Sequence, residues 1–163
     1  MDSDRRETLY LERAKSELDL ARAVFTLSIT PDLKKELGLK EDATFFSNVI
    51  GNSYYGIFYA AKALLWKKGI ITEAPDEHRK TLDAFEKLTL SGEIDFELLE
   101  IYRQLTVRAD ELLGIFRWEK SKRGEFTYHK LPQANLEPAK ESLNHATTFV
   151  KNINLVLKKS TIH

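Results

Sequence analysis

Apolar residues at helical spacing form two adjacent stripes in the stretch between residues 42 and 68, and this feature restricts the fold most. The first stripe consists of Phe46, Ile50, Ser53, Ile57, Ala60 and Leu64. The second stripe consists of Phe45, Val49, Tyr54, Phe58, Ala61 and Leu65. Residues three or four apart share one helix face, so two stripes side by side make an unusually wide apolar surface. The stretch predicts a long helix that contacts several neighbours from the centre of a helical bundle.

The same spacing predicts three further long helices, over about residues 4–29, 95–118 and 135–157. Shorter helical segments are expected at residues 33–37, after Pro31, and from a cap at Asp76 to Ser91. The apolar period fails between residues 119 and 135, which predicts an irregular connection. We therefore expect an all-α fold, an up-down antiparallel bundle of four long helices plus short helices, in one domain over residues 1–163.

Composition excludes several other classes of protein. Leu occurs 23 times and Val 5 times, and Gly and Pro together make 11 residues, which is typical of helices and not of β-sheets. The absence of cysteine excludes disulfide scaffolds and thiolate metal sites. No apolar run approaches the ~20 residues that cross a bilayer, and the N-terminus does not look like a signal peptide. We expect a cytoplasmic protein with no membrane association.

The stretch Ser53-Tyr-Tyr-Gly-Ile-Phe-Tyr-Ala-Ala-Lys-Ala-Leu-Leu65 resembles the signature helix of HEPN domains, which are small prokaryotic helical-bundle proteins. The Lys67-Lys68-Gly69 stop and the His78-Arg79-Lys80 helix start follow in the order that the family shows. The resemblance covers about residues 8–158. It implies a HEPN-type bundle that forms a homodimer and binds nucleotides or RNA, often as the toxin of a toxin–antitoxin pair. From the residues alone, the aromatic helix is explained by core packing.

A basic segment between residues 117 and 130 is the most suggestive stretch for chemistry. It holds five Lys or Arg residues against two Glu, a local charge of +3 in a chain whose charges balance at 25 against 25. Cations bind phosphates and aromatic rings stack on bases, so the mixture favours nucleic acid. The candidate RNA- or nucleotide-binding residues are Arg117, Trp118, Lys120, Lys122, Tyr128 and Lys130. A solvated basic loop explains the same composition.

Within this segment, Arg123 and His129 stand at a spacing that resembles the Arg–His motif of HEPN ribonucleases. The resemblance implies that Arg123 holds the scissile phosphate and His129 transfers a proton, without a metal. Gly124 and Leu131 depart from the polar and aromatic residues found at these places in the family. The resemblance thus implies one of two functions: a metal-independent endoribonuclease, or a non-catalytic HEPN module that dimerises and partners a separate nucleotidyltransferase-like antitoxin.

The other histidines suggest no second site. His78, in the first turn of a predicted helix, is expected to be an isolated exposed side chain. His145 falls off the apolar stripe of the last helix and is expected to face solvent. Acidic residues of the first helix lack a histidine at metal-binding spacing. We expect no metal site and no cofactor.

Overall fold

The chain forms six helices and no strand over residues 2–114 and 135–160, which are the residues that the computed structural model describes. These helices are α1 (Asp2–Ile29), α2 (Pro31–Glu36), α3 (Phe46–Lys67), α4 (Glu77–Leu90), α5 (Phe96–Leu113) and α7 (Leu136–Ser160). The all-α prediction is confirmed. None of the helices in these two ranges combines the length and the apolar character that crossing a membrane requires.

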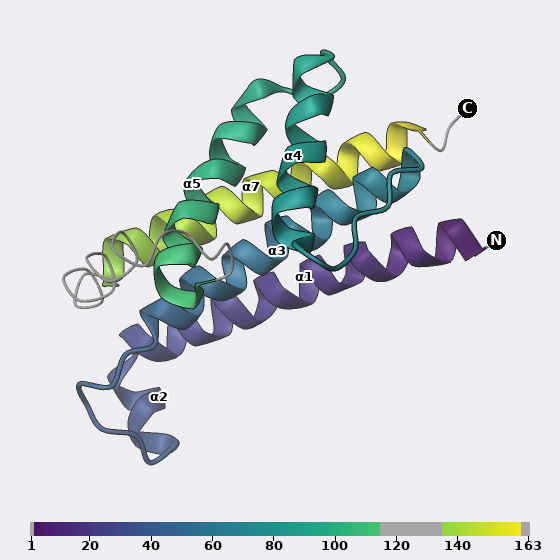
Figure 1. Cartoon of the computed structure of the whole chain (residues 1–163). Coiled ribbons are helices and arrows are strands. Elements are labelled where there is room, and N and C mark those ends of the chain that lie inside the picture. Colours follow the sequence, from purple (N-terminus) through teal and green to yellow (C-terminus); the bar gives the residue numbers. More distant parts are fainter. Residues whose placement is uncertain (1, 115–134, 161–163) are drawn as a thin grey trace.

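Helix α3 lies at the centre of the molecule, between α1 on one side and α7 on the other, while α4 and α5 pack on a further side (Figure 1). Helix α1 runs in the direction opposite to α3 and α7. Most side chains of α3 are buried, including residues from both predicted stripes. The expectation of a central helix with several neighbours is therefore confirmed.

A glycine sets the distance between α1 and α3. A Cβ atom at Gly56 would lie 3.0 Å from Cδ2 of Leu18 and 3.5 Å from the carbonyl oxygen of Ala14. Leu18 and Ala14 are themselves buried. The two backbones can approach this closely because position 56 has no side chain.

Four aromatic rings fill the main core where α3, α4, α5 and α7 meet. Tyr54, Phe85, Tyr102 and Phe149 are each completely buried, and neighbouring rings in this group have centroids 5.3 to 6.5 Å apart. A second apolar cluster surrounds the start of α3 and joins it to the end of α1 and the start of α7. This cluster consists of Ala21, Phe46, Val49, Ile50, Ala139 and Leu143.

The central helix begins at Phe46, four residues later than residue 42, so the predicted start was wrong. The residues before it form an irregular segment tied to α1 and α2. The buried ammonium of Lys34 donates to the carbonyl oxygens of Ser28 and Ala43, and the Ser28 hydroxyl accepts from the backbone N–H of Phe45. These bonds satisfy backbone groups that a longer helix would otherwise use.

The fourth predicted helix also differs at its end, because α5 stops at Leu113 and not at residue 118. Gly114 adopts a left-handed conformation with φ of 64°, and its N–H donates to the carbonyl oxygen of Asp110. A residue without a Cβ adopts this conformation without strain, which makes it a common helix stop. Asp76 does precede α4 as predicted, but its side chain makes no capping hydrogen bond.

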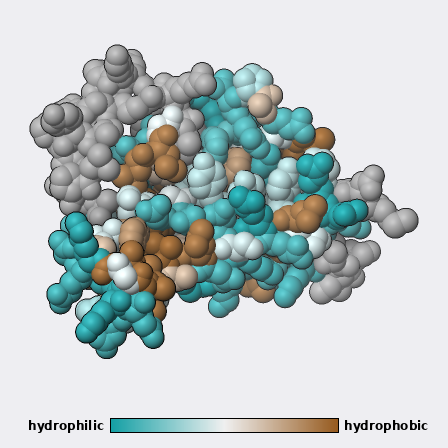
Figure 2. Space-filling model, turned by 90° about the horizontal axis from the view of Figure 1, so that it is seen from below, coloured by the Kyte–Doolittle hydropathy of each residue, from teal (hydrophilic) through white to brown (hydrophobic). Residues whose placement is uncertain are grey.

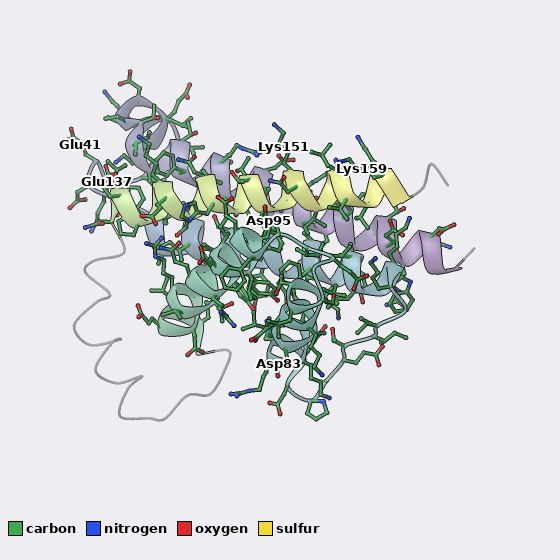
Figure 3. The ribbon with its side chains drawn as sticks, turned by 90° about the horizontal axis from the view of Figure 1, so that it is seen from above. Glu41, Asp83, Asp95, Glu137, Lys151 and Lys159 are labelled. Carbon is green, nitrogen blue, oxygen red and sulfur yellow. The ribbon has the colours of Figure 1, made fainter. Side chains whose placement is uncertain are left out.

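The labelled Glu137 and Lys151 lie on the outside of the molecule (Figure 3). The underside shows a hydrophilic surface interrupted by several hydrophobic patches (Figure 2). Leu9, Leu20 and Ile29 of α1 are each about half exposed. Helix α1 therefore buries one side against α3 and leaves apolar residues on its outer surface.

We predict that Gly56→Ala is less stable than Gly51→Ala by about 1 to 2 kcal/mol. Both substitutions give the same gain in helix propensity. The new methyl group overlaps Leu18 only at position 56, since at position 51 the nearest atom would be at an ordinary 3.6 Å. Urea unfolding followed by circular dichroism measures the difference. Equal stability of the two variants would show that α1 and α3 are not held at this distance.

Candidate functional site

All eight candidate residues of the basic segment lie outside the described residues. These are Arg117, Trp118, Lys120, Lys122, Arg123, Tyr128, His129 and Lys130. The structure does place the helices that precede and follow the segment. Leu112, near the end of α5, and Ala139, near the start of α7, both pack into the cluster around Phe46. The described residues on either side of the segment therefore lie beside the first turns of α3.

Four aromatic rings on α1 and α3 form a continuous series, which we call the α1–α3 face. Tyr55 and Tyr59 are stacked with centroids 6.3 Å apart, and Tyr59 is stacked on Tyr10 at 6.4 Å. Tyr10 meets Trp66 edge-on at 6.2 Å. All four rings are partly exposed. The spacing of Tyr55, Tyr59 and Trp66 places these three rings on one side of α3. The neighbouring helices leave this side open.

Arginines of α1 lie over these rings. The guanidinium carbon of Arg13 is 5.2 Å from the centroid of Tyr59, and that of Arg6 is 5.1 Å from the centroid of Trp66. A guanidinium at this distance is attracted to the ring face, and its planar fork of N–H groups can still donate to two oxygens of a phosphate. The sequence pattern did not single out these arginines, because their partners lie on a helix distant in the chain.

The α1–α3 face contains an open depression of about 730 Å³. Its lining includes three arginines and one glutamate, which gives it an excess of positive charge. The lining residues are Arg5, Arg6, Leu9, Tyr10, Glu12, Arg13, Ser16 and Tyr59. The volume lies within the range of small-molecule sites. Cations and ring faces at one place are suited to a ligand with phosphate groups and flat bases.

Glu17 lies one turn after Arg13 on α1 and connects this helix to α3. Its carboxylate accepts from Nε of Arg13 at 3.2 Å and from Nδ2 of Asn52 at 2.8 Å. The carboxylate neutralises part of the charge of Arg13 and fixes the amide of Asn52. Arg5 and Arg6 have no such carboxylate partner among residues 4–114 and 135–159, whose side chains the structure describes.

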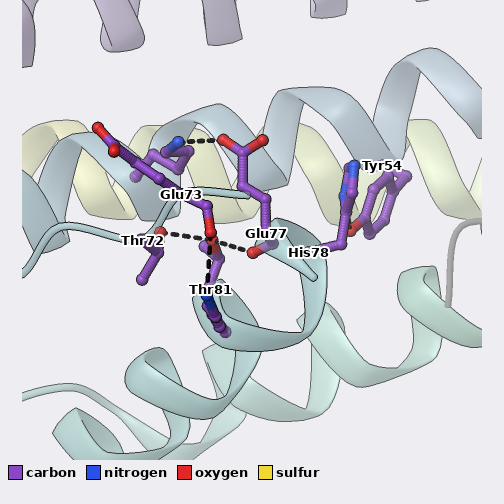
Figure 4. A network of polar contacts seen from close by, with 8 residues as sticks. Tyr54, Thr72, Glu73, Glu77, His78 and Thr81 are labelled. Carbon is purple, nitrogen blue, oxygen red and sulfur yellow. Dashed lines mark hydrogen bonds and ion pairs between the residues drawn. The ribbon is translucent and has the colours of Figure 1, made fainter. Parts of the chain in front are cut away.

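His78 is half-buried, so the expectation that it is an isolated exposed side chain was wrong. Its ring stacks on Phe58 with centroids 4.3 Å apart, and its Nδ1 lies 2.8 Å from the hydroxyl oxygen of Tyr54 (Figure 4). It also meets the edge of Tyr55, at 5.9 Å. The first turn of α4 brings the imidazole against α3, a tertiary contact that local spacing does not reveal.

Lys62 and Glu77 form an ion pair next to His78 (Figure 4). Lys62 is buried, and its ammonium also lies 5.0 Å from the centroid of Tyr10 and 5.7 Å from that of Phe58. A buried ammonium needs such partners, because removing one would leave an uncompensated charge. The pair therefore fixes the start of α4 against α3.

Burial is the main cause of the pKa shifts of His78, Tyr54 and Tyr55. It lowers the pKa of His78 below 6.5, Lys62 acts in the same direction, and Glu77 opposes both. Burial also raises the pKa of Tyr54 far above its ordinary value, so the hydroxyl keeps its proton. The pKa of Tyr55 is raised by burial and by the neighbouring Tyr59. Near neutral pH the cluster thus holds a neutral imidazole between neutral phenols.

The side chain of His145 is 36% exposed, so it partly faces solvent. Its Nδ1 lies 4.0 Å from a carboxylate oxygen of Glu141. Over residues 2–114 and 135–160, no three metal-ligating side chains gather in one place.

Comparison with known proteins gives no assignment. No model of a protein family matches the chain, and no curated protein matches it.

We predict that the protein loses stability as the pH falls from above 6.5 through the lower pKa of folded His78. Between these values the unfolded chain binds more protons than the folded one, so protonation favours unfolding. Urea unfolding of the wild type and of His78→Phe at several pH values isolates the contribution of His78 to the free energy of unfolding. The variant keeps a ring on Phe58 but cannot titrate at this position. The same pH dependence in both proteins would contradict the buried position of His78.

Proposed function

We propose that this chain is a HEPN-type helical bundle that binds single-stranded RNA. It would act as the toxin-like component of a toxin–antitoxin type system. The sequence motif of α3 supports the family, and the all-α arrangement around that helix agrees with it. The observation that carries the function is the α1–α3 face, where partly exposed rings are overlaid by arginines.

Such a face supplies both kinds of contact that a flexible nucleic-acid strand requires. Ring faces stack on bases without regard to sequence, and guanidinium groups neutralise phosphates. The basic segment 117–130 adds a further local charge of +3. The described residues Leu112 and Ala139, which precede and follow this segment, pack at the start of α3, the helix that also carries the rings of the α1–α3 face. We therefore assign both surfaces to one strand.

In this proposal Arg123 and His129 carry the chemistry. Arg123 would bind the scissile phosphate, since guanidinium is a permanent cation with paired donors. His129 would act as general base toward the ribose 2′-hydroxyl or as general acid toward the leaving oxygen. A second copy of the chain would supply the other proton-transfer group, which is why we also propose a homodimer. The exposed Leu9 and Leu20, eleven residues apart and so on one side of α1, are apolar surface that a dimer could cover.

A non-catalytic module is the alternative form of the same proposal. The chain would then bind a separate nucleotidyltransferase-like protein and would dimerise without cleaving RNA. Purification from the native host distinguishes the two, because a bound partner protein of this class supports the module.

We predict that Arg13→Ala and Tyr59→Ala both weaken the binding of single-stranded RNA. Loss of a phosphate contact at Arg13 should lower the slope of log K against log salt by about 0.7, and loss of stacking at Tyr59 should cost about 1 to 3 kcal/mol. Arg22→Ala is the matched control, because Arg22 pairs with Asp19 and lies nine residues further along α1, on the opposite side of that helix from Arg13. Fluorescence anisotropy at several salt concentrations measures both effects. Equal losses in all three variants would reject the face as the binding surface.

We also predict RNA cleavage that persists in excess chelator and falls about 10²- to 10⁴-fold in His129→Ala. Arg123→Ala should lose activity as well, with both variants confirmed as folded by circular dichroism. Light scattering of the same samples should show a dimer. Activity that both variants retain would exclude these catalytic roles, and a monomer at micromolar concentration would exclude the paired arrangement.

A further inference from the structure

A small groove lies where the first turns of α3 meet the last turn of α5. Its volume is about 230 Å³. Side chains and backbone from both helices line it, and these residues are Ser47, Asn48, Gly51, Asn52, Tyr55, Leu112 and Leu113. Tyr55 is also the end of the ring series of the α1–α3 face. The groove is therefore continuous with the surface to which we assign RNA binding.

Gly51 forms part of this groove, and no contact in the described residues requires a glycine there. Glycine inside a helix is less favourable than alanine by about 1 kcal/mol. At Gly56 the close contact with α1 explains the choice, but a Cβ at Gly51 would lie 3.6 Å from Cδ1 of Leu113, an ordinary distance. A missing side chain allows a ligand to approach the helix backbone closely. An occupant of the groove that approaches the helix backbone would account for this glycine.

Two carboxamides stand one helical turn apart at the same place. Nδ2 of Asn52 donates to Glu17, which fixes the plane of that amide. Its Oδ1, and the whole side-chain amide of Asn48, have no hydrogen-bond partner among the described residues. A carboxamide offers a donor and an acceptor side by side, which matches the edge of a base and suits adenine best.

We propose that this groove binds one nucleobase of the RNA strand and selects adenine. The base would lie on Gly51, stack beside Tyr55, contact the apolar Leu112 and Leu113, and hydrogen-bond to Asn48 and Asn52. This inference rests on the proposed function and deepens it, since it adds a base-specific position to a surface that otherwise binds any sequence.

The test compares fluorescein-labelled oligoadenylate, oligouridylate and oligocytidylate of about twelve nucleotides by anisotropy. The wild type should prefer oligoadenylate, and Asn48→Ala should reduce that preference by about five- to a hundredfold. Gly51→Ala should act likewise, because its methyl group fills the place of the base. A cooperative unfolding transition of Gly51→Ala in urea confirms that this variant is folded. Asn144→Ala, an exposed position on α7, is the matched control and should keep the wild-type preference.

The outcomes distinguish a failure of the proposed RNA-binding function from a failure of the groove proposal. A wild type that binds no RNA rejects the proposed function, and the groove proposal falls with it. Binding that depends on Arg13 but shows equal affinity for the three oligonucleotides, or the same preference in Gly51→Ala and wild type, rejects the groove alone. A change of oligomeric state in Gly51→Ala, seen by light scattering with unchanged RNA affinity, assigns the groove to contact with a second copy and also overturns the proposal.

Discussion

The close contact between α1 and α3 is the constraint on which the rest of the structure depends. Gly56 allows Leu18 and the backbone at Ala14 to approach α3 without a gap. With α1 at this distance and α7, α4 and α5 on the other sides, α3 is almost entirely enclosed. A helix that is apolar around most of its surface needs this enclosure, because any uncovered side would expose a row of large apolar groups to water.

Because α3 is enclosed on nearly all sides, only a few of its residues lie on the side that remains open. Tyr54 points into the core and reaches His78, whereas its neighbour Tyr55 lies on the open side and starts the ring series. The arginines of α1 reach these rings only because the two helices are so close. The packing of α3 and the composition of the α1–α3 face are therefore consequences of the same helix contact.

Helix positions could be predicted from the sequence because the apolar period records which side of each helix is buried. The start of α3 could not, since it depends on Lys34 and Ser28 bonding across three segments of the chain. His78 was misjudged for the same reason, because a single histidine carries no local sign of the ring on which it stacks. The contacts of Arg6 and Arg13 with the rings of α3, on which the proposed binding surface rests, were not predicted, while Arg123 and His129 remain predictions from motif and charge alone.

The central claim is that RNA binds on the α1–α3 face, and a chemical-shift titration of the labelled protein with single-stranded RNA tests it most directly. The account predicts that the backbone signals of Arg6, Arg13, Tyr55 and Tyr59 move together and saturate, while those of the outer side of α7 around Lys151 stay in place. Movement confined to α7, or no movement at all at concentrations where RNA binds, would contradict it.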